Sequence, residues 1–416
     1  MDKLVIDGGN PLSGSIEISG AKNAVLPIMA LSLLVDGKSK LQRVPDLRDT
    51  RTFLKLLNLL GATSNFDNHS LTIDASNITS LEAPYDLVKT MRASFYVMGP
   101  LLARFGEARV SLPGGCAWGP RPVDYHLKGF EKLGAKIILK DGYIIARCER
   151  LVGANIHFEV ASVGATANIT MASVLADGIT KISNAAAEPH IVQLCETLNQ
   201  MGADIEGIGT NQLIITGVDK LKPFDILIIP DMIEAGTFLF AGATLGRITL
   251  TKVDPNHLST VLDKLSQVGC HLSTTENSIT IDQCDLIKPV DMSTDVYPGF
   301  PTDLQAQWIA LMSTSNGTSV ITDNIYHDRF SHVPELNRLG ADITTENNSA
   351  IVRGVKGLKG AQVMSTDIRA SASLVIAGLI AKGRTNISRV YHIDRGYERI
   401  EEKFHSLGAK IYRENE

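Results

Sequence analysis

The sequence predicts an α/β protein, α+β in its details, made of six repeated β-β-α-β-α units that form two domains of three units each. The main observation is a signature, most often Leu-Gly-Ala, that recurs along the chain with 73, 68, 67, 71 and 68 residues between successive glycines. Near-equal intervals of this length indicate one supersecondary unit repeated many times. The six glycines are Gly61, Gly134, Gly202, Gly269, Gly340 and Gly408.

The elements of one unit follow from the patterns around these glycines. Each glycine follows an amphipathic helix, such as Glu398–Leu407, and is expected to end it as a C-cap. A strand pair comes next, for example Ile137–Leu139 and Tyr143–Ala146. A further strand then leads to an apolar helix, such as Ser371–Ala381, which is expected to be buried because it has no polar face. A last strand, such as Ile248–Lys252, completes the unit.

The two ends of the chain predict how the units are divided. The last glycine is followed by a single strand, Ala409–Tyr412, without its hairpin partner. The N-terminal residues 3–12 carry the pattern of that missing partner, so we expect them to complete the sixth unit. This predicts a discontinuous domain, 1–20 with 230–416, around an inserted domain, 21–229. The alternative of two consecutive domains leaves the C-terminal strand unpaired.

Composition excludes several classes of function. The 416 residues carry a net charge of −5, so no overall positive field attracts nucleic acid or an anionic membrane. No apolar run reaches the roughly 18 residues of a membrane span, and the N-terminus lacks a signal-peptide pattern. We therefore expect a cytoplasmic protein. The sequence leaves the oligomeric state open, with a monomer as one alternative.

The five cysteines are expected to be reduced thiols. They are odd in number, and they form no Cys-x-x-Cys pair and no Cys/His ligand spacing, so no metal site is predicted. They are Cys116, Cys148, Cys195, Cys270 and Cys284.

Cys116 lies in a loop, 111–126, that is rich in glycine and proline. A cysteine reacts as its thiolate, and a nearby cation such as Arg121 lowers the pKa of a thiol. One interpretation is therefore a reactive thiol, and the other is an exposed loop with an incidental cysteine. Trp118 in the same loop is either a packing residue or a ligand contact.

Polar residues recur at two places in the repeat. The first is the strand-to-helix junction that opens the apolar helix, 37 to 42 residues before each glycine. The second lies 13 residues before a glycine, ahead of the amphipathic helix. Because repeats put like positions at like places, these groups should gather on one face of each domain, beside helix N-termini that favour anions. The first set is Lys22, Arg92, Ser162, Asp231, Asp303 and Asp367; the second is Arg48, Arg121 and Arg395.

These residues allow more than one interpretation. Asp303 and Asp367 could be ordinary carboxylates favoured by a helix dipole. Lys22 and Arg92 oppose that dipole, which favours a role in binding an anion, and arginine suits phosphate and carboxylate. Nucleotide-binding fingerprints are absent, since Gly207-Ile-Gly209 lacks the third glycine.

Six stretches carry a resemblance that covers essentially the whole chain. They resemble the enolpyruvyl transferase family, and in particular its members that act on UDP-N-acetylglucosamine. The resemblance implies a two-domain inside-out α/β barrel with the active site in the cleft between the domains. It implies transfer of enolpyruvate from phosphoenolpyruvate to the 3′-hydroxyl of UDP-N-acetylglucosamine, the first committed step of peptidoglycan synthesis, without a cofactor. The stretches are 20–24, 113–124, 162–166, 300–307, 366–371 and 392–399.

The resemblance also implies roles for individual residues. Cys116 corresponds to the proton donor to the methylene carbon, which can also form a covalent pyruvyl adduct, and Asp303 to the group that accepts the sugar hydroxyl proton. Lys22 and Arg395 complete the catalytic set. Phosphoenolpyruvate would be bound by Lys22, Asn23, Arg92, Arg121 and Arg395. The sugar nucleotide would contact Asn23, Arg92, Arg121, Pro122, Val123, Asp124, Tyr125, Ser162, Val163, Asp303 and Ile325; Asp367, Arg369 and Arg48 are further candidates.

Two departures from the family pattern affect the expected nucleotide site. Some relatives have lysine where this chain has Val160 and Arg48. Arg48 keeps the charge, whereas Val160 removes a contact expected for the diphosphate. Two alternatives stay open, an enolpyruvyl transferase that acts on shikimate 3-phosphate and a non-catalytic repeat protein. The Cys116 loop argues against the former, and the cations at helix starts argue against the latter.

Overall fold

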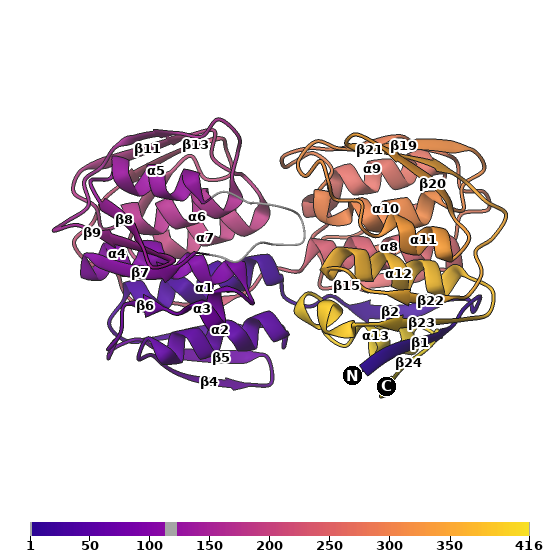
Figure 1. Ribbon diagram of the computed structural model, residues 1–416, viewed down its shortest axis with the longest axis horizontal. Coiled ribbons are helices and arrows are strands. Elements are labelled where there is room, and N and C mark those ends of the chain that lie inside the picture. The colour runs from indigo at the N-terminus through magenta and orange to yellow at the C-terminus, as the bar shows by residue number, and fades with distance from the viewer. Residues whose placement is uncertain (1, 113–122, 416) are drawn as a thin grey trace. The chain divides into compact units, whose positions relative to one another are not determined.

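The computed structural model describes residues 2–112 and 123–415, and the chain divides into two compact units. The discontinuous unit combines the residues up to Ser19 with those from Pro230 onward, and the inserted unit spans Gly20–Ile229. Each unit contains three four-stranded sheets, and its helices pack against them (Figure 1). The six repeated units, three in each part of the chain, are therefore confirmed.

In the inserted unit, each sheet combines an edge strand, a central strand and a hairpin. The sheets are β14 (Asp225–Leu227), β3 (Lys38–Gln42), β5 (Ser70–Asp74), β4 (Thr63–Asp67); β6 (Glu82–Ala83), β7 (Glu107–Ser111), β9 (Tyr143–Arg147), β8 (Lys136–Lys140); and β10 (Asn155–His157), β11 (Ile179–Ser183), β13 (Gln212–Thr216), β12 (Asp204–Glu206). The helices are α1 (Lys22–Leu31), η1 (Ser32–Leu34), α2 (Arg48–Leu59), α3 (Tyr85–Val88), η2 (Arg92–Val97), α4 (Met98–Phe105), α5 (Asp124–Lys132), α6 (Val163–Ser173) and α7 (Pro189–Gln200).

The discontinuous unit repeats the same plan. Its sheets are β2 (Gly14–Glu17), β15 (Ile248–Thr251), β17 (Ser278–Ile281), β16 (Leu272–Thr274); β18 (Met292–Thr294), β19 (Thr318–Asp323), β21 (Ser349–Arg353), β20 (Asp342–Glu346); and β22 (Gln362–Met364), β23 (Arg384–Ser388), β1 (Asp2–Asp7), β24 (Lys410–Asn415). Its helices are α8 (Met232–Leu245), η3 (Pro255–Leu258), α9 (Ser259–Val268), η4 (Thr302–Leu304), α10 (Gln305–Met312), α11 (Val333–Arg338), α12 (Ile368–Ile380), η5 (Val390–Arg395) and α13 (Ile400–Ser406).

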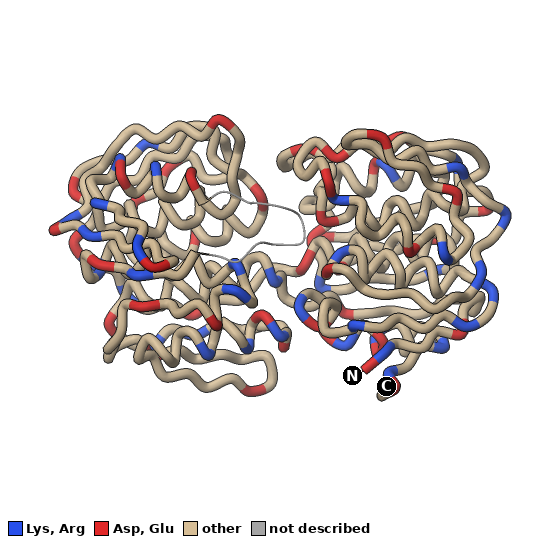
Figure 2. The backbone as a smooth tube through the Cα atoms, viewed as in Figure 1, with Lys and Arg blue, Asp and Glu red and all other residues tan. Residues whose placement is uncertain are grey.

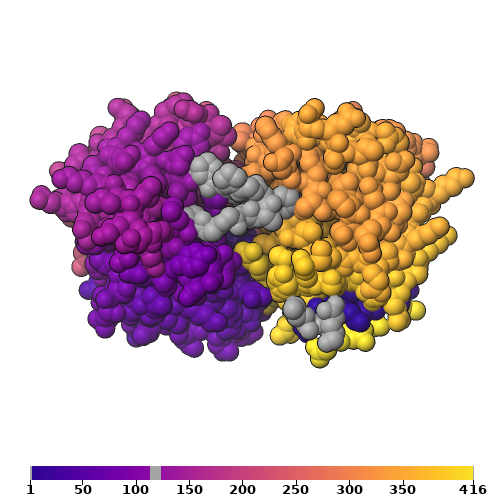
Figure 3. Space-filling view, in the orientation of Figure 1, coloured from indigo at the N-terminus to yellow at the C-terminus, as the bar shows by residue number. Residues whose placement is uncertain are grey.

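The N-terminal strand β1 completes the last sheet, as the sequence predicts. It pairs antiparallel with β23 on one side and with β24 on the other, with Val5 opposite Asn386 and Tyr412. The indigo N-terminal residues accordingly lie among yellow C-terminal ones on the surface (Figure 3). Because β1 occupies an inner position, its backbone groups are satisfied on both sides and the edge passes to β24.

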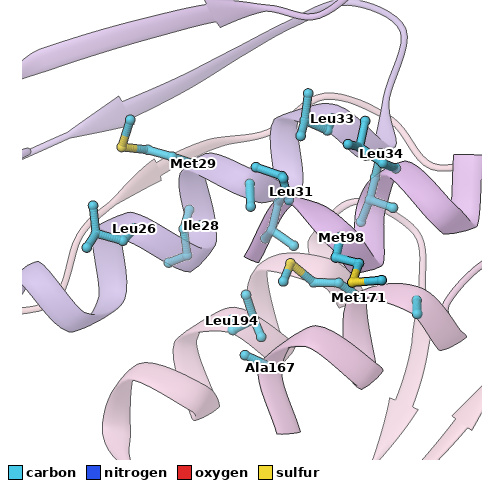
Figure 4. Packing of buried hydrophobic residues seen from close by; sticks show 14 of the residues in the cluster. Leu26, Ile28, Met29, Leu31, Leu33, Leu34, Met98, Ala167, Met171 and Leu194 are labelled. Atoms are coloured by element: carbon cyan, nitrogen blue, oxygen red, sulfur yellow. The ribbon is translucent and has the colours of Figure 1, made fainter. Parts of the chain in front are cut away.

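Each unit is built around three helices that are buried nearly all round. In the discontinuous unit these are α8, α10 and α12, which contact one another, and all eight residues of α10 are buried. In the inserted unit, side chains of α1, η1, α4, α6 and α7 form a common apolar cluster that includes Leu31, Met98 and Met171 (Figure 4). Burial of this much apolar surface supplies the main driving force for folding.

The signature glycines end the amphipathic helices for a conformational reason. All six have positive φ, between 91° and 109°, which glycine adopts without a steric cost. In the part of the chain that the structure describes, no helix has both the length and the apolar character needed to cross a membrane.

The prediction that all five cysteines are free thiols is wrong, because Cys270 and Cys284 form a disulfide. Cys270 follows the glycine that ends α9, and Cys284 follows β17. The repeat brings the end of this helix and the end of this strand together, so the two Cα atoms lie 4.8 Å apart. Counting cysteines could not reveal this pairing, since it depends on tertiary proximity.

We expect thiol titration of the denatured protein, purified without reductant, to give three thiols per chain, the five cysteines less the two in the disulfide. After reduction the count should be five. A bond that closes a loop of 14 residues should stabilise the fold by about 3 kcal/mol, so the variant with serine at both positions should unfold at lower urea concentration. Cys148→Ser is the control and should lower each count by one. Five thiols before reduction would contradict the pairing.

Candidate functional site

The structure places all six predicted junction residues at the start of a buried helix or of the 3₁₀ turn that precedes one. In the inserted unit, Lys22 opens α1, Arg92 opens η2 and Ser162 is the N-cap of α6. In the discontinuous unit the corresponding residues are all aspartates, Asp231, Asp303 and Asp367. Outside these positions, charges gather along outer strands and loops, while the middle helices are mostly uncharged (Figure 2).

Lys22 forms a buried ion pair with Asp49. Its Nζ lies 2.9 Å from Asp49 Oδ2, and the two side chains are 11% and 4% exposed. Lys22 has no carboxylate cap at its own helix start, where the dipole disfavours a cation. Asp49, in the first turn of α2, supplies the compensating charge. The ammonium group is therefore held at a helix start by a neighbouring helix.

Beside Arg92 lies a buried histidine, His126, whose proton position is fixed by Asn168. Asn168 Oδ1 accepts from the Gly99 N–H and its Nδ2 donates to the Phe95 carbonyl, which sets the direction of the amide. The same Nδ2 lies 3.1 Å from His126 Nδ1, so that nitrogen accepts and the proton is on Nε2. Burial, with a further contribution from Arg92, lowers the pKa of His126 to about 3. His126 is therefore neutral near pH 7.

The start of α6 offers backbone and hydroxyl groups close to this histidine. The Ser162 hydroxyl accepts a hydrogen bond from the Ala165 N–H. Val163 and Gly164, which lie between these two residues, form the first turn of α6. A side chain at Gly164 would come within 3.1 Å of His126 Nε2, so α5 and α6 pack closely here. Other predicted binding residues of this unit lie on the starts of α1, α2 and α5: Asn23, Arg48, Val123, Asp124 and Tyr125.

Cys116, Trp118, Arg121 and Pro122 lie outside the described residues. Among residues 2–112 and 123–415, no group of three or more His, Cys, Asp or Glu side chains is arranged to hold a metal ion.

In the discontinuous unit, two of the three junction aspartates act as helix caps. Asp231 accepts from the N–H groups of Ile233 and Glu234, and Asp367 accepts from those of Arg369 and Ala370. For these two carboxylates the structural interpretation accounts for the residue type, because each satisfies N–H groups that a helix start leaves without partners.

Asp303 differs, because its carboxylate pairs with two arginines instead of capping a helix. Oδ1 accepts from Arg329 and Oδ2 from Arg369, each at 2.9 Å. The two arginine side chains are 6% and 5% exposed, and that of Asp303 is 26% exposed. Burial by itself would raise the pKa of Asp303, but Arg369 and Arg329 more than offset it and hold the pKa well below its usual range. The carboxylate is ionised and weakly basic in this arrangement.

Arg369 is supported in turn by a buried aromatic residue, Tyr397. The guanidinium carbon lies 5.6 Å from the Tyr397 ring centre, and the phenol oxygen contacts Thr237 at 2.9 Å and Gln307 at 3.1 Å. Gln307 also donates to the Asp303 carbonyl. Side chain and backbone of Asp303 are thus held by one connected group. The remaining predicted residues of this unit are Ile325, which follows β19, and Arg395, which ends η5.

Three residues of this arrangement were missed by the sequence analysis: Asp49, Arg329 and Tyr397. Asp49 did carry a signal, because it lies four residues before Phe53 on the apolar face of its helix, where a carboxylate needs a partner. Arg329 lies in the connection from β19 to α11 but not at the recurrent position 13 residues before the glycine, and Tyr397 resembles an ordinary core residue. No periodic signal distinguishes these two.

The architecture is that of an enolpyruvyl transferase. The solved structure of the enolpyruvyl transferase NikO from Streptomyces tendae matches with a TM-score of 0.91 and 26% identity, and the match covers 99% of this chain and 98% of that one. The family model described as EPSP synthase (3-phosphoshikimate 1-carboxyvinyltransferase) matches residues 6–404. The chain therefore belongs to this family of enolpyruvyl transferases, which are enzymes.

More similar relatives share nearly the whole length of the chain. One, from Chloroherpeton thalassium, is 58% identical and covers 100% of this chain and 97% of its own. Another, from Prosthecochloris aestuarii, is 55% identical over 100% of this chain and 99% of its own. Both are named UDP-N-acetylglucosamine 1-carboxyvinyltransferase.

The pairing of Asp303 predicts a specific pH dependence of stability. Because its pKa is depressed in the folded state, its contribution should be fully present above its ordinary value of 3.8 and be lost as the pH falls through the depressed value. The difference in unfolding free energy between the protein and Asp303→Asn should therefore be constant from pH 7 to about 5 and shrink only below about 4. Urea unfolding at stepped pH measures it.

The control is Asp263→Asn, which removes one charge from an exposed position on α9 of the same unit. It should change stability little at any pH. A difference for Asp303→Asn that already shrinks above pH 5 would show that the arginines do not hold the carboxylate ionised.

Proposed function

We propose that this enzyme transfers the enolpyruvyl group of phosphoenolpyruvate to the 3′-hydroxyl of UDP-N-acetylglucosamine and releases phosphate, a step that supplies peptidoglycan synthesis. The observation that carries the proposal is identity of 53–58% along the full chain to relatives that bear the name of this activity. The cations Lys22 and Arg92 at helix starts of the inserted unit support it, since both substrates are anions and the chain as a whole is negatively charged.

Cations at helix starts suit the phosphate and carboxylate of phosphoenolpyruvate. Lys22 can offer its ammonium group beside the N–H groups of α1, and Asn23 follows it on the same turn. Arg92 opens η2 in the same unit. We assign the substrate anion to these residues together with Arg121 and Arg395.

The sugar nucleotide needs hydrogen-bond donors for its diphosphate and contacts for its rings. The first turn of α6, with Ser162 and Val163, presents N–H groups of the kind that bind phosphate. Val160, 57% exposed just before this turn, brings no charge, so backbone groups carry more of the diphosphate binding here than in relatives with lysine. The other contacts are assigned to Arg121, Pro122, Val123, Asp124, Tyr125, Asp303 and Ile325.

The reaction combines an addition step that moves two protons with an elimination step that removes one. The sugar hydroxyl oxygen bonds to C2 of phosphoenolpyruvate while its proton leaves to Asp303 and a proton from Cys116 adds to C3. Loss of a proton from C3 and of phosphate from C2 then restores the double bond in the product. An acid near C3 and a base near the sugar hydroxyl lower the barriers of both steps.

The arginines make Asp303 a weak base until an anion competes for them. An incoming phosphate or carboxylate can take over hydrogen bonds from Arg329 or Arg369. Each bond lost by Asp303 raises its pKa toward the usual value and makes it a stronger base. Substrate binding would thereby prepare the carboxylate to accept the hydroxyl proton.

The other cysteines favour Cys116 as the reacting thiol. Burial raises the pKa of Cys148, and burial with a smaller effect of Glu196 raises that of Cys195 to about 12. Cys270 and Cys284 are joined to each other. None of these four can supply a thiolate readily near neutral pH.

The choice of acceptor tests the proposal directly. With phosphoenolpyruvate present, we expect phosphate release with UDP-N-acetylglucosamine and none above background with shikimate 3-phosphate. Colorimetric phosphate determination measures both, and omission of either substrate is the control. Release with shikimate 3-phosphate instead would favour the alternative activity, and release with neither acceptor would favour a non-catalytic repeat protein.

Replacement of Lys22 should separate substrate binding from stability. Lys22→Ala should raise the KM for phosphoenolpyruvate by about 10- to 100-fold, the worth of one charge-assisted hydrogen bond. The same change should lower the melting temperature, because Asp49 stays buried without its ion-pair partner.

The double variant Lys22→Ala, Asp49→Ala distinguishes the two effects. It should regain most of the lost stability, since no unpaired carboxylate is left, while the KM stays high. A double variant whose KM returns to the original value would show that Lys22 supports the fold and does not bind phosphoenolpyruvate.

A further inference from the structure

The fifth repeat ends its central strand with a residue that differs in kind from its counterparts. In every repeat the central strand runs beside a parallel edge strand and ends at the same place in the sheet. Five of the six end residues are uncharged, and the sixth is a carboxylate with no exposed surface. A buried charge is costly unless it is well compensated, so its presence calls for a reason. The six are Gln42, Ser111, Ser183, Thr251, Asp323 and Ser388.

Asp323 is compensated by hydrogen bonds from three separate segments. Its Oδ1 accepts from the Thr294 hydroxyl at 2.8 Å, at the end of β18. The same oxygen accepts from the N–H groups of Ile325 and Tyr326, at 3.0 and 2.8 Å, in the turn that follows β19. Its Oδ2 accepts from the Thr302 hydroxyl at 2.7 Å, at the start of η4.

Thr302 connects this carboxylate to the Asp303 site. Its hydroxyl oxygen accepts from Arg329 Nη1 at 3.0 Å, while Nη2 of the same guanidinium donates to Asp303 Oδ1 at 2.9 Å. Arginine can only donate, so the single hydroxyl proton of Thr302 must point to Asp323. The direction of every hydrogen bond from Asp323 to Asp303 is therefore fixed.

From this chain of contacts we infer that Asp323 is a positioning residue for the transfer reaction. Through Thr302 and Arg329 it orients the carboxylate of Asp303, and through two backbone N–H groups it holds the turn that carries Ile325. The inference rests on the function proposed above, which gives Asp303 and Ile325 their roles. Asp323 itself is fully buried and acts through its neighbours.

Asparagine at this position would lose one set of contacts in either orientation of its amide, those to Thr302 in one and those to the turn in the other. With its Nδ2 toward Thr302, the threonine proton loses its acceptor. With its Nδ2 toward the turn, a donor faces the N–H groups of Ile325 and Tyr326. The variant keeps the size of the side chain, so the effect reports on hydrogen bonding and charge rather than on packing.

The experiment measures kcat and both KM values for Asp323→Asn, Thr302→Val and the double variant. We expect each single change to lower kcat by about 10- to 100-fold, the cost of a misplaced reacting group, with the KM for phosphoenolpyruvate changed less than threefold. The double variant should lose no more than the more affected single variant, because both changes break one chain. Thr302→Ser keeps the hydroxyl, so its kcat should stay near the value of the original protein.

Thr251→Val is the matched control, since Thr251 ends the central strand of the neighbouring repeat and should leave kcat unchanged. Losses that multiply in the double variant would overturn the connection through Thr302. A lower melting temperature with unchanged kcat in Asp323→Asn would overturn the positioning role and leave Asp323 as a purely structural residue.

A second measurement tests the connection between Asp323 and Asp303 without relying on the proposed activity. If the unaltered protein releases no phosphate from phosphoenolpyruvate and UDP-N-acetylglucosamine, the function fails, while the effect of Asp323 on Asp303 can still be measured. The stability difference caused by Asp303→Asn should then begin to shrink at higher pH in the Asp323→Asn background than in the original one. An unchanged pH dependence would overturn the inference.

Discussion

Burial of three helices in each unit is the constraint on which the rest of the structure depends. A helix packed on all sides must still satisfy the N–H groups of its first turn and accommodate its dipole. The chain meets this demand with Asp231, Asp367 and Ser162, each an N-cap whose side chain accepts from the turn that follows. Lys22 and Asp303 occupy the same positions in their repeats but do not cap the helices that follow, so their residue types need another explanation.

Each of these two residues is stabilised by a partner from outside its own helix. Lys22 is neutralised by Asp49 of α2, and Asp303 by Arg329 and Arg369. Such buried pairs give little net stability, because their attraction mainly repays the desolvation of the charges. They do hold charged groups in place at helix starts, where Lys22 is largely buried and Asp303 is partly exposed. Exchange of these partners with an anionic substrate belongs to the function proposed above. The two units thus use one scaffold to present opposite charges.

Much of the fold could be predicted from the sequence because a repeat amplifies weak local signals. One Leu-Gly-Ala is uninformative, whereas six at near-equal spacing define the unit, and an unpartnered strand after Gly408 implies its pairing with β1. The start of each buried helix could be located in the same way. The contacts of Asp49 and Arg329 and the Cys270–Cys284 disulfide could not, because they join segments whose proximity follows only from packing.

The fifth unit combines three features around Asp303. Between Thr294 and Phe300 the chain makes an extra excursion before it rejoins the edge of the sheet, and the central strand β19 ends in a buried carboxylate. The same unit supplies Asp303 from a 3₁₀ turn instead of a regular N-cap. Thr302 and Arg329 connect Asp323 to Asp303 by hydrogen bonds, and this connection holds the Asp303 carboxylate in a fixed direction. In the function proposed above, a bound anion would then change the proton affinity of a carboxylate that is already oriented.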